Sequence, residues 1–236
     1  MKALLVRVGA DQSKSGGFWN GPVDMQNRRF VYVPIPESYA VHPGLNKPFS
    51  LLVSELATLN CALPVQLHMQ NMHLDPDFSR LTYGDQGRRG AQITNTLTRG
   101  DLLVFYAGLR DIRGARNLVY ALIGLYVIDF IEKARDVYHG DRDCNAHTRR
   151  ILSQNADDIV VYATPGISGR FERCIDIGEY RNRAYRVRPP LLDTWGGLSV
   201  HDGYLQRSGT LPGFLDAPRF YDWILSQDVR ILKRNN

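Results

Sequence analysis

Cysteine and long apolar runs are both scarce in this sequence of 236 residues, and each scarcity excludes a class of protein. The three cysteines, Cys61, Cys144 and Cys174, are widely spaced and odd in number, which suits reduced thiols better than a disulfide framework. No two of them have the Cys-x-x-Cys spacing of a zinc ribbon or knuckle. No apolar run approaches the roughly 20 residues that cross a bilayer, so we expect no membrane segment.

The first residues are also unlike a targeting signal. Arg7 follows a short aliphatic stretch, which is too short for the apolar core of a secretory signal peptide. Together with the cysteine pattern, this predicts a cytoplasmic protein.

Lysine is the third scarce residue, because 24 of the 29 basic residues are arginine. A guanidinium group matches phosphates and guanine edges, and it stacks on bases. Codon usage in a GC-rich genome explains the arginine total more simply. Local arginine clusters therefore indicate nucleic-acid contact better than the total does.

Short β-branched and aliphatic runs dominate the middle of the chain, and few stretches between them are long enough for the helical crossovers of a parallel sheet. We predict one α+β domain over residues 1–236, with a mainly antiparallel curved sheet or small β-barrel and peripheral helices. A doubly wound α/β sheet is the alternative, but it lacks a glycine-rich phosphate loop after its first strand. The expected strands are 3–8, 30–35, 102–107, 118–128 with a bulge at Gly124, 158–163 and 171–177; the expected helices are 49–59 and 217–227; and 11–20 is an expected loop with exposed aromatics.

His73, Asp75 and Asp77 alternate along the chain, so they would lie on one side of an extended segment. Such a set can transfer protons or bind a divalent metal. The ligand count is incomplete for a metal, so we assign the three residues proton transfer as the catalytic group and no metal. The alternative is a turn at Asp-Pro-Asp in which Asp75 caps the bend. Tyr83 and Asp85 follow as candidate nucleotide-binding residues.

Arg88 and Arg89 lie between two glycines. This segment predicts a phosphate-binding loop, because backbone amides and guanidinium groups can converge there. A solvated surface loop is the alternative.

Asn145, His147, Arg149 and Arg150 form the next cluster. An asparagine can bind a base edge through two hydrogen bonds, and arginines can bind phosphate. In the alternative, Asn145 caps a short helix that carries the two arginines outward. A nucleophilic Cys144 paired with His147 would lack a defined third member.

Arginines and aromatic residues are interleaved further along the chain. Arg170 and Arg173, with the tyrosines and arginines of 180–188, suit stacking on unpaired bases and contact with a phosphate backbone. Alternation between core and solvent would give the same pattern. Trp195 precedes two glycines that allow close approach of a flat ligand, and Arg207 is a further candidate nucleotide contact, although a packed loop accounts for most of this segment.

Several of these segments, taken together, match a known family. They are 2–9, 73–78, 81–85, 100–106, 145–150, 195–198 and 202–209. They resemble the third type of nucleotide modification associated domain, a family associated with DNA base hypermodification. The resemblance covers nearly the whole chain, and it implies a DNA or nucleotide partner and other base-modification enzymes; it implies no particular catalytic residue or cofactor. Residues 101–106 and 121–127 are also similar to the core of PUA-like and EVE-like barrels, which hold a flipped base.

Three functions remain open at this point. In the first, the chain is an enzyme that acts on a modified DNA base or nucleotide. In the second, it is a non-catalytic reader with an aromatic cage, for which Trp19, Tyr106, Tyr126 and Trp195 are candidates. In the third, it only positions a partner enzyme. The cofactor, the transferred group and the choice among DNA, RNA and free nucleotide are not determined by the sequence.

Overall fold

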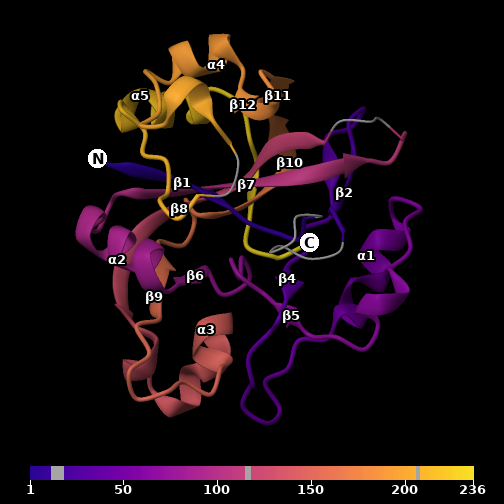
Figure 1. Ribbon diagram of the computed structural model, residues 1–236, viewed down its shortest axis with the longest axis vertical. Helices are drawn as coiled ribbons and strands as arrows, with labels where there is room; N and C mark the ends of the chain where they lie inside the picture. Colours follow the sequence, from indigo (N-terminus) through magenta and orange to yellow (C-terminus); the bar gives the residue numbers. More distant parts are fainter. Residues whose placement is uncertain (12–18, 115–117, 206–207) are drawn as a thin grey trace.

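The computed structural model describes residues 1–11, 19–114, 118–205 and 208–236. Two long antiparallel strands, β7 (Leu102–Asp111) and β8 (Val119–Lys133), form the centre of its main sheet (Figure 1). Within the described ranges this sheet has nine strands. The other seven are β1 (Ala3–Arg7), β2 (Pro22–Asp24), β3 (Arg29–Phe30), β6 (Thr82–Asp85), β9 (Ile159–Ala163), β10 (Gly169–Asp176) and β13 (Ile231–Leu232).

The pairing of these strands confirms the predicted α+β fold with a mainly antiparallel, curved sheet. The first part of β8 pairs with β7 and β10, and its last part pairs with β9, which in turn pairs with β6. Because one long strand serves both groups of neighbours, the sheet curls into a half-barrel (Figure 1). β1 and β2 add to β7 in parallel. The antiparallel pairing of the long strands excludes the doubly wound alternative.

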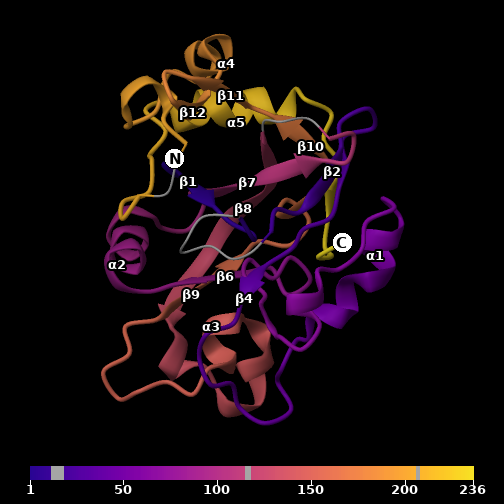
Figure 2. The same cartoon turned by 45° about the vertical axis from the view of Figure 1, so that its right-hand side comes forward.

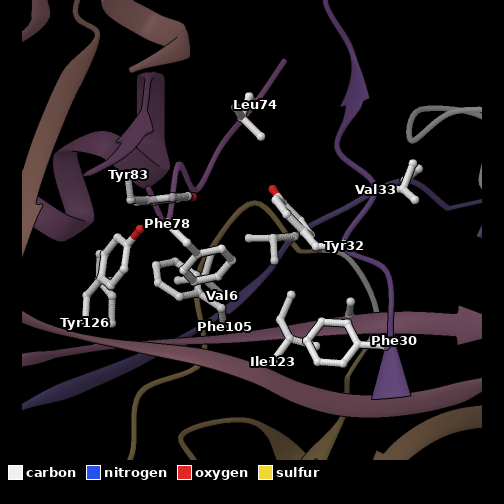
Figure 3. Close-up of a cluster of buried hydrophobic side chains, with 14 of the residues drawn as sticks. Val6, Phe30, Tyr32, Val33, Leu74, Phe78, Tyr83, Phe105, Ile123 and Tyr126 are labelled. Atoms are coloured by element: carbon white, nitrogen blue, oxygen red, sulfur yellow. The ribbon is translucent and has the colours of Figure 1, made fainter. Parts of the chain in front are cut away.

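The sheet is buried on both faces, because successive side chains of its strands point to opposite sides. On β1, Leu4 and Val6 enter one core, while Leu5 enters a second core on the other face. The first core contains a cluster of aromatic rings in which Phe78 packs edge-on against Phe105 (Figure 3). Helix α5 (Ala217–Leu225) covers the second core.

The bulge expected at Gly124 is present. The register between β7 and β8 shifts there, and the alternation between the two cores shifts by one residue: Ile123 lies in the first core and Leu125 in the second. A Cβ atom on Gly124 would lie 2.5 Å from the Phe78 ring and 2.8 Å from the carbonyl oxygen of Gly169. This close approach explains why glycine occupies the position.

Two helical segments were expected, and both form. Residues 49–59 contain a 3₁₀ turn (Phe49–Leu52) followed by α1 (Val53–Ala57), and α5 begins with Pro218 in its first turn and buries Phe220 and Ile224. Two further helices were not expected: α2 (Gly87–Thr96) and α4 (Pro189–Thr194). A third, α3 (Ala146–Arg149), is the short helix capped by Asn145 that was the alternative interpretation of this segment. Figures 1 and 2 show α4 and α5 at one end of the molecule and α3 at the other.

The loop expected at Arg88 and Arg89 is wrong, because both residues lie in the first turn of α2, while their binding of phosphate stays a prediction. This helix forms because Ile93 and the following Leu97 bury their side chains in the first core. The predicted strand 30–35 is also wrong as one element. It divides into the end of β3 and the short strand β4 (Ile35–Pro36), which pairs with β5 (Met72–His73) outside the main sheet.

No helix in the described part of the chain combines the length and the apolar character needed to cross a membrane. Most of the loop expected at 11–20 lies outside the described residues.

Candidate metal centre

Two histidines and one aspartate converge between β5, β6 and α3. His73 ends β5, Asp75 follows two residues later, and His147 lies in α3. The Nε2 atoms of His73 and His147 lie 3.9 Å and 3.8 Å from Oδ2 of Asp75, and one ligand atom from each of the three side chains lies within 4.8 Å of the others. All three residues are buried.

Each imidazole is held from behind by a second carboxylate. Nδ1 of His73 donates to Glu37 (2.7 Å), and Nδ1 of His147 donates to Asp158 (2.6 Å). An ionised carboxylate can only accept a hydrogen bond, so Nδ1 of each ring carries a proton, and a neutral ring then has its lone pair on Nε2. The two lone pairs therefore face Asp75. A carboxylate behind a histidine is the usual support of a metal-bound imidazole.

The charge states agree with this assignment. Burial lowers the pKa of His73 to about 4, so this ring is neutral at neutral pH. Burial would raise the pKa of Glu37, but the hydrogen bond from His73 and the charge of Arg150 lower it to about 2. Burial likewise opposes ionisation of Asp158, yet its hydrogen bond from His147 lowers its pKa. Both supporting carboxylates are therefore ionised.

Asp75 is oriented so that one of its oxygens stays available. Its Oδ1 accepts hydrogen bonds from the backbone N–H of Gly84 (2.8 Å) and from the side-chain amide of Asn145 (2.9 Å). Its Oδ2 faces the two imidazoles at distances too long for hydrogen bonds. Burial raises the pKa of Asp75 to about 6, which shows how poorly its charge is compensated by the protein alone.

Asn145 connects this carboxylate to the helix that carries His147. Its side-chain oxygen accepts from the backbone N–H of His147 (2.9 Å) and so caps α3, while its amide donates to Asp75. Gly84, on β6, packs against the imidazole ring of His147. A Cβ atom at Gly84 would lie 2.2 Å from Cδ2 of His147, so the ring can approach β6 this closely because residue 84 is a glycine.

Arg150 lies between the two supporting carboxylates and offsets part of their charge. Its Nη2 lies 3.1 Å from Glu37, and its Nη1 lies 3.6 Å from Asp158. The guanidinium also stacks on the ring of Tyr39, 4.2 Å from its centroid. Nη2 is 3.0 Å from Nδ1 of His73, but that nitrogen already donates to Glu37, so this contact is not a hydrogen bond.

The distances among the two Nε2 atoms and Oδ2 of Asp75 suit a metal ion bound between them better than a shared proton. Ligand atoms that are each about 2.0–2.2 Å from one metal ion lie about 2.8–3.6 Å from one another in tetrahedral or octahedral geometry. The two distances to Oδ2 of Asp75 exceed this range by a few tenths of an ångström, and all three ligand atoms lie within 4.8 Å of one another, so the side chains would have to rotate inward to hold an ion. Two imidazoles and one carboxylate are the protein ligands of zinc hydrolases and of non-haem iron(II) enzymes.

A cavity of about 350 Å³ opens onto this cluster. Its volume is at the lower end for small-ligand sites. Its wall includes Arg7, Tyr83, Asp85 and Arg89. Arg89 donates to the hydroxyl of Tyr83 (2.7 Å) and pairs with Asp85 (2.9 Å), while its buried Nε has no partner among the described residues. The cavity therefore presents polar groups of both signs next to the candidate ligands.

A family model identifies the chain. The model described as nucleotide modification associated domain 3 matches residues 2–209. The chain belongs to this family. A search of curated proteins and a search of solved structures each returned no match.

Membership of the nucleotide modification associated domain 3 family confirms the resemblance stated from the sequence and indicates a role in nucleotide or DNA modification. His73, Asp75, His147 and their supporting carboxylates all lie within the matched residues. Helix α5 and strand β13 follow the matched range. The similarity to PUA-like barrels stays a prediction.

In this nucleotide modification associated domain, many of the residues expected to form the site do lie together. His73, Asp75, Tyr83, Asp85, Arg89, His147 and Arg150 line the one cavity, and Asn145 lies directly behind it. His147 and Asn145 were expected to bind a base. The structure places His147 among the candidate ligands and Asn145 in contact with Asp75, which suggests different roles.

Asp77 lies apart from His73 and Asp75, although all three were expected on one side of an extended segment. The extended segment ends at Asp75, and the backbone N–H groups of Ser79 and Arg80 donate to Asp77 in a turn. The Asp77 carboxylate is buried against Arg149 (2.7 Å). Arg149 is therefore not directed outward, as a helix carrying the arginine pair to the surface would require.

The remaining candidate residues occupy other parts of the domain. Arg88 is exposed on α2 and is not part of the cavity wall. Arg170 and Arg173 line a different cavity, described below. Trp195 is fully buried in the second core. Arg207 lies outside the described residues.

The aromatic cage of the reader hypothesis does not assemble. Tyr126 is buried in the first core, with Trp19 packed against it, whereas Tyr106 and Trp195 are buried in the second core on the opposite face of the sheet. These rings cannot enclose one base.

Glu37 and Asp158 are the functional residues that the sequence did not reveal. Glu37 lies 36 positions before His73, and Asp158 lies 11 positions after His147. Each is brought to its histidine by strand pairing, since β4 pairs with β5 and the strand after Asp158, β9, pairs with β6. Such contacts join residues that are distant in the sequence, so no local sequence motif identifies Glu37 or Asp158.

Proposed function

We propose that this protein is a metal-dependent enzyme of DNA base modification, in which His73, Asp75 and His147 bind one divalent transition-metal ion. The observation that carries the proposal is the convergence of two Nε2 lone pairs and one carboxylate oxygen, each supported by a hydrogen bond on its far side. Without a cation this arrangement buries a carboxylate against two acceptors, which is unfavourable. With a cation it becomes a complete set of protein ligands.

The substrate is a nucleotide whose base enters the cavity beside the metal. Family membership supports the nucleotide, and the cavity is of a size that suits a single base better than a duplex. A base in duplex DNA has to be flipped out of the stack to reach such a site. Arg89 on the cavity wall is positioned to interact with its phosphate or its carbonyl oxygens.

Three protein ligands leave coordination positions for a water molecule, a co-substrate or the base itself. A metal ion held by His73, Asp75 and His147 would supply a Lewis acid or a redox centre there, and the surrounding residues orient its ligands. Glu37, Asp158 and Arg150 fix the imidazoles, and Gly84 and Asn145 fix the carboxylate.

The first test is metal binding by the purified, chelator-treated protein. We expect one cobalt(II) or zinc(II) ion per chain by calorimetry, and loss of that binding in His147→Ala and in Asp75→Asn. His201→Ala is the matched control, since His201 is exposed and far from the ligand set in the sequence. The visible spectrum of the cobalt(II) form reports coordination number, because tetrahedral cobalt absorbs much more strongly than octahedral cobalt.

The second test is product formation. Nucleoside mass spectrometry compares DNA from cells that contain the wild-type gene, the Asp75→Asn variant or no gene. A modified nucleoside that requires the wild-type chain, and that is absent with Asp75→Asn, supports the proposal. Wild-type metal affinity in Asp75→Asn and His147→Ala would show that these residues are not ligands.

A further inference from the structure

A second polar site surrounds Arg170, on β10. Its backbone is fixed inside the main sheet, where it pairs with Gly124 of β8 and Leu232 of β13. The residue is 4% exposed, and its guanidinium stacks on the ring of Phe30, 4.8 Å from the centroid. This arginine is therefore almost completely withdrawn from bulk water.

The buried guanidinium lacks a protein partner. Its Nε and Nη1 atoms are buried and make no hydrogen bond, and its side chain forms no ion pair with any described residue. Burial and the nearby charge of Arg234 lower the pKa of Arg170 to about 10. Burial of an unpaired charge is unfavourable, and stacking on one aromatic ring offsets only part of that effect.

A cavity of about 330 Å³ lies against this side chain, and its wall is rich in arginine. Arg29, Arg173 and Arg234 join Arg170 there, and within the described ranges none of the four forms an ion pair. Two carboxylates, Glu55 and Glu172, also line the cavity, so the formal charge of its wall is positive. This cavity shares no lining residue with the one beside His73.

We propose that the cavity around Arg170 binds a phosphoryl group. Four arginines, one from β3, two from β10 and one from the segment after β13, line the space, which suits the several oxygens of a tetrahedral phosphate better than the two oxygens of a planar carboxylate. Phosphate would complete the hydrogen bonds of Arg170 and neutralise the arginines around it. The phosphoryl group can belong to a nucleic-acid backbone or to a free nucleotide, and the experiment below separates these sources.

The decisive variant is Arg170→Met, which keeps the length of the side chain and removes the charge. Inorganic phosphate is titrated into the chelator-treated protein at constant ionic strength and followed by calorimetry and thermal unfolding. We expect phosphate to bind and stabilise the wild-type chain, and Arg170→Met to weaken binding at least tenfold while its Tm without phosphate stays equal or rises. Arg219→Met, on the exposed face of α5, is the control and should bind phosphate within twofold of wild type.

Binding measurements with two further ligands, an oligonucleotide and a mononucleotide, identify the source of the phosphoryl group. If Arg170→Met lowers the affinity for a single-stranded oligonucleotide tenfold and leaves the affinity for a mononucleotide unchanged, the site binds a nucleic-acid backbone. The reverse result would show that the site binds a free nucleotide. Because chelator is present throughout, failure of the metal proposal does not affect this result. The inference is overturned if phosphate does not bind, if Arg170→Met binds it as wild type does, or if binding appears only in Glu55→Gln, which would make Glu55 the partner of Arg170.

Discussion

Asp75 has two carboxylate oxygens with opposite surroundings. Oδ1 is held by Gly84 and Asn145, whereas Oδ2 faces the Nε2 atoms of two imidazoles. A carboxylate and two acceptor lone pairs repel one another unless a cation or a proton lies between them. The separations of 3.8 Å and 3.9 Å are too long for a shared proton. At the residue scale, this geometry is the reason to expect a metal.

Gly84 provides a sharp test at this scale, because its substitution changes no ligand. In Gly84→Ala the new Cβ would meet Cδ2 of His147 at 2.2 Å and Oδ1 of Asn145 at 2.6 Å, so the ring has to move away from Asp75. We expect cobalt(II) affinity to fall about 10- to 100-fold, the range for lost support of a metal ligand. The free energy of unfolding should fall by about 1–3 kcal/mol. Calorimetry and urea unfolding measure the two effects.

Gly209→Ala is the matched control, since a Cβ atom at Gly209 meets nothing within 4 Å. It should leave both quantities unchanged. Wild-type metal affinity in Gly84→Ala would mean that the position of the His147 ring does not matter, and the ligand assignment would be wrong.

At the scale of elements, α3 is too short to be stable alone, because helices of a single turn do not form without tertiary support. A capping box holds it: Asn145 accepts from the backbone of His147, and the hydroxyl of Thr148 accepts from the backbone N–H of Asn145 (3.1 Å). The cap is therefore part of the metal site, since it fixes the helix that carries one ligand.

Thr148→Val tests this link, because valine keeps the volume and removes the hydroxyl. We expect a loss of about 1 kcal/mol in the free energy of unfolding and a severalfold weaker metal affinity, both from a looser first turn. Thr148→Ser retains the hydroxyl and should behave as wild type in both measurements. Equal loss of metal affinity in Thr148→Ser and Thr148→Val would assign the effect to packing and not to the cap.

The long strands and the first and last helices could be predicted from the sequence, and some other elements could not. β7, β8 and β9 are continuous apolar runs, and α5 has an apolar face, so local pattern is sufficient for them. By contrast, α2 buries little besides Ile93, and its glycines and arginines give a loop-like pattern. α3 depends on contacts with distant segments, which no local pattern contains.

The candidate site was predictable to a similar degree. His73 and Asp75 are near neighbours in the sequence, so their pairing is visible there. His147 was recognised as functional but not as a third ligand, because its distance from Asp75 is set by the packing of α3 on β6. Glu37 and Asp158 reach the site entirely through strand pairing.

At the scale of the whole molecule, the ligands come from segments about 70 positions apart that meet only in the folded chain. A metal that binds the folded but not the unfolded chain therefore stabilises the fold, by about 2.7 kcal/mol when its free concentration is 100 times Kd. For a chain of this length we expect Tm to rise by about 5–10 °C. Calorimetric scans with metal and with chelator measure the shift, which Asp75→Asn should abolish. An equal rise in that variant would place the stabilising metal elsewhere.

The parallel pairing of β1 with β7 also has a consequence for how the protein is made. The backbone N–H of Lys2 bonds to Asp101, 99 positions away, so β1 leaves the ribosome long before its partner strand exists. Both faces of β1 are apolar. Until β7 emerges from the ribosome, β1 is therefore an exposed, unpaired apolar segment of the nascent chain, which chaperones can bind. Arg7, at the end of this strand, lines the cavity beside the candidate metal ligands. One part of the cavity wall is therefore synthesised early and reaches its final position only after β7 has paired with β1.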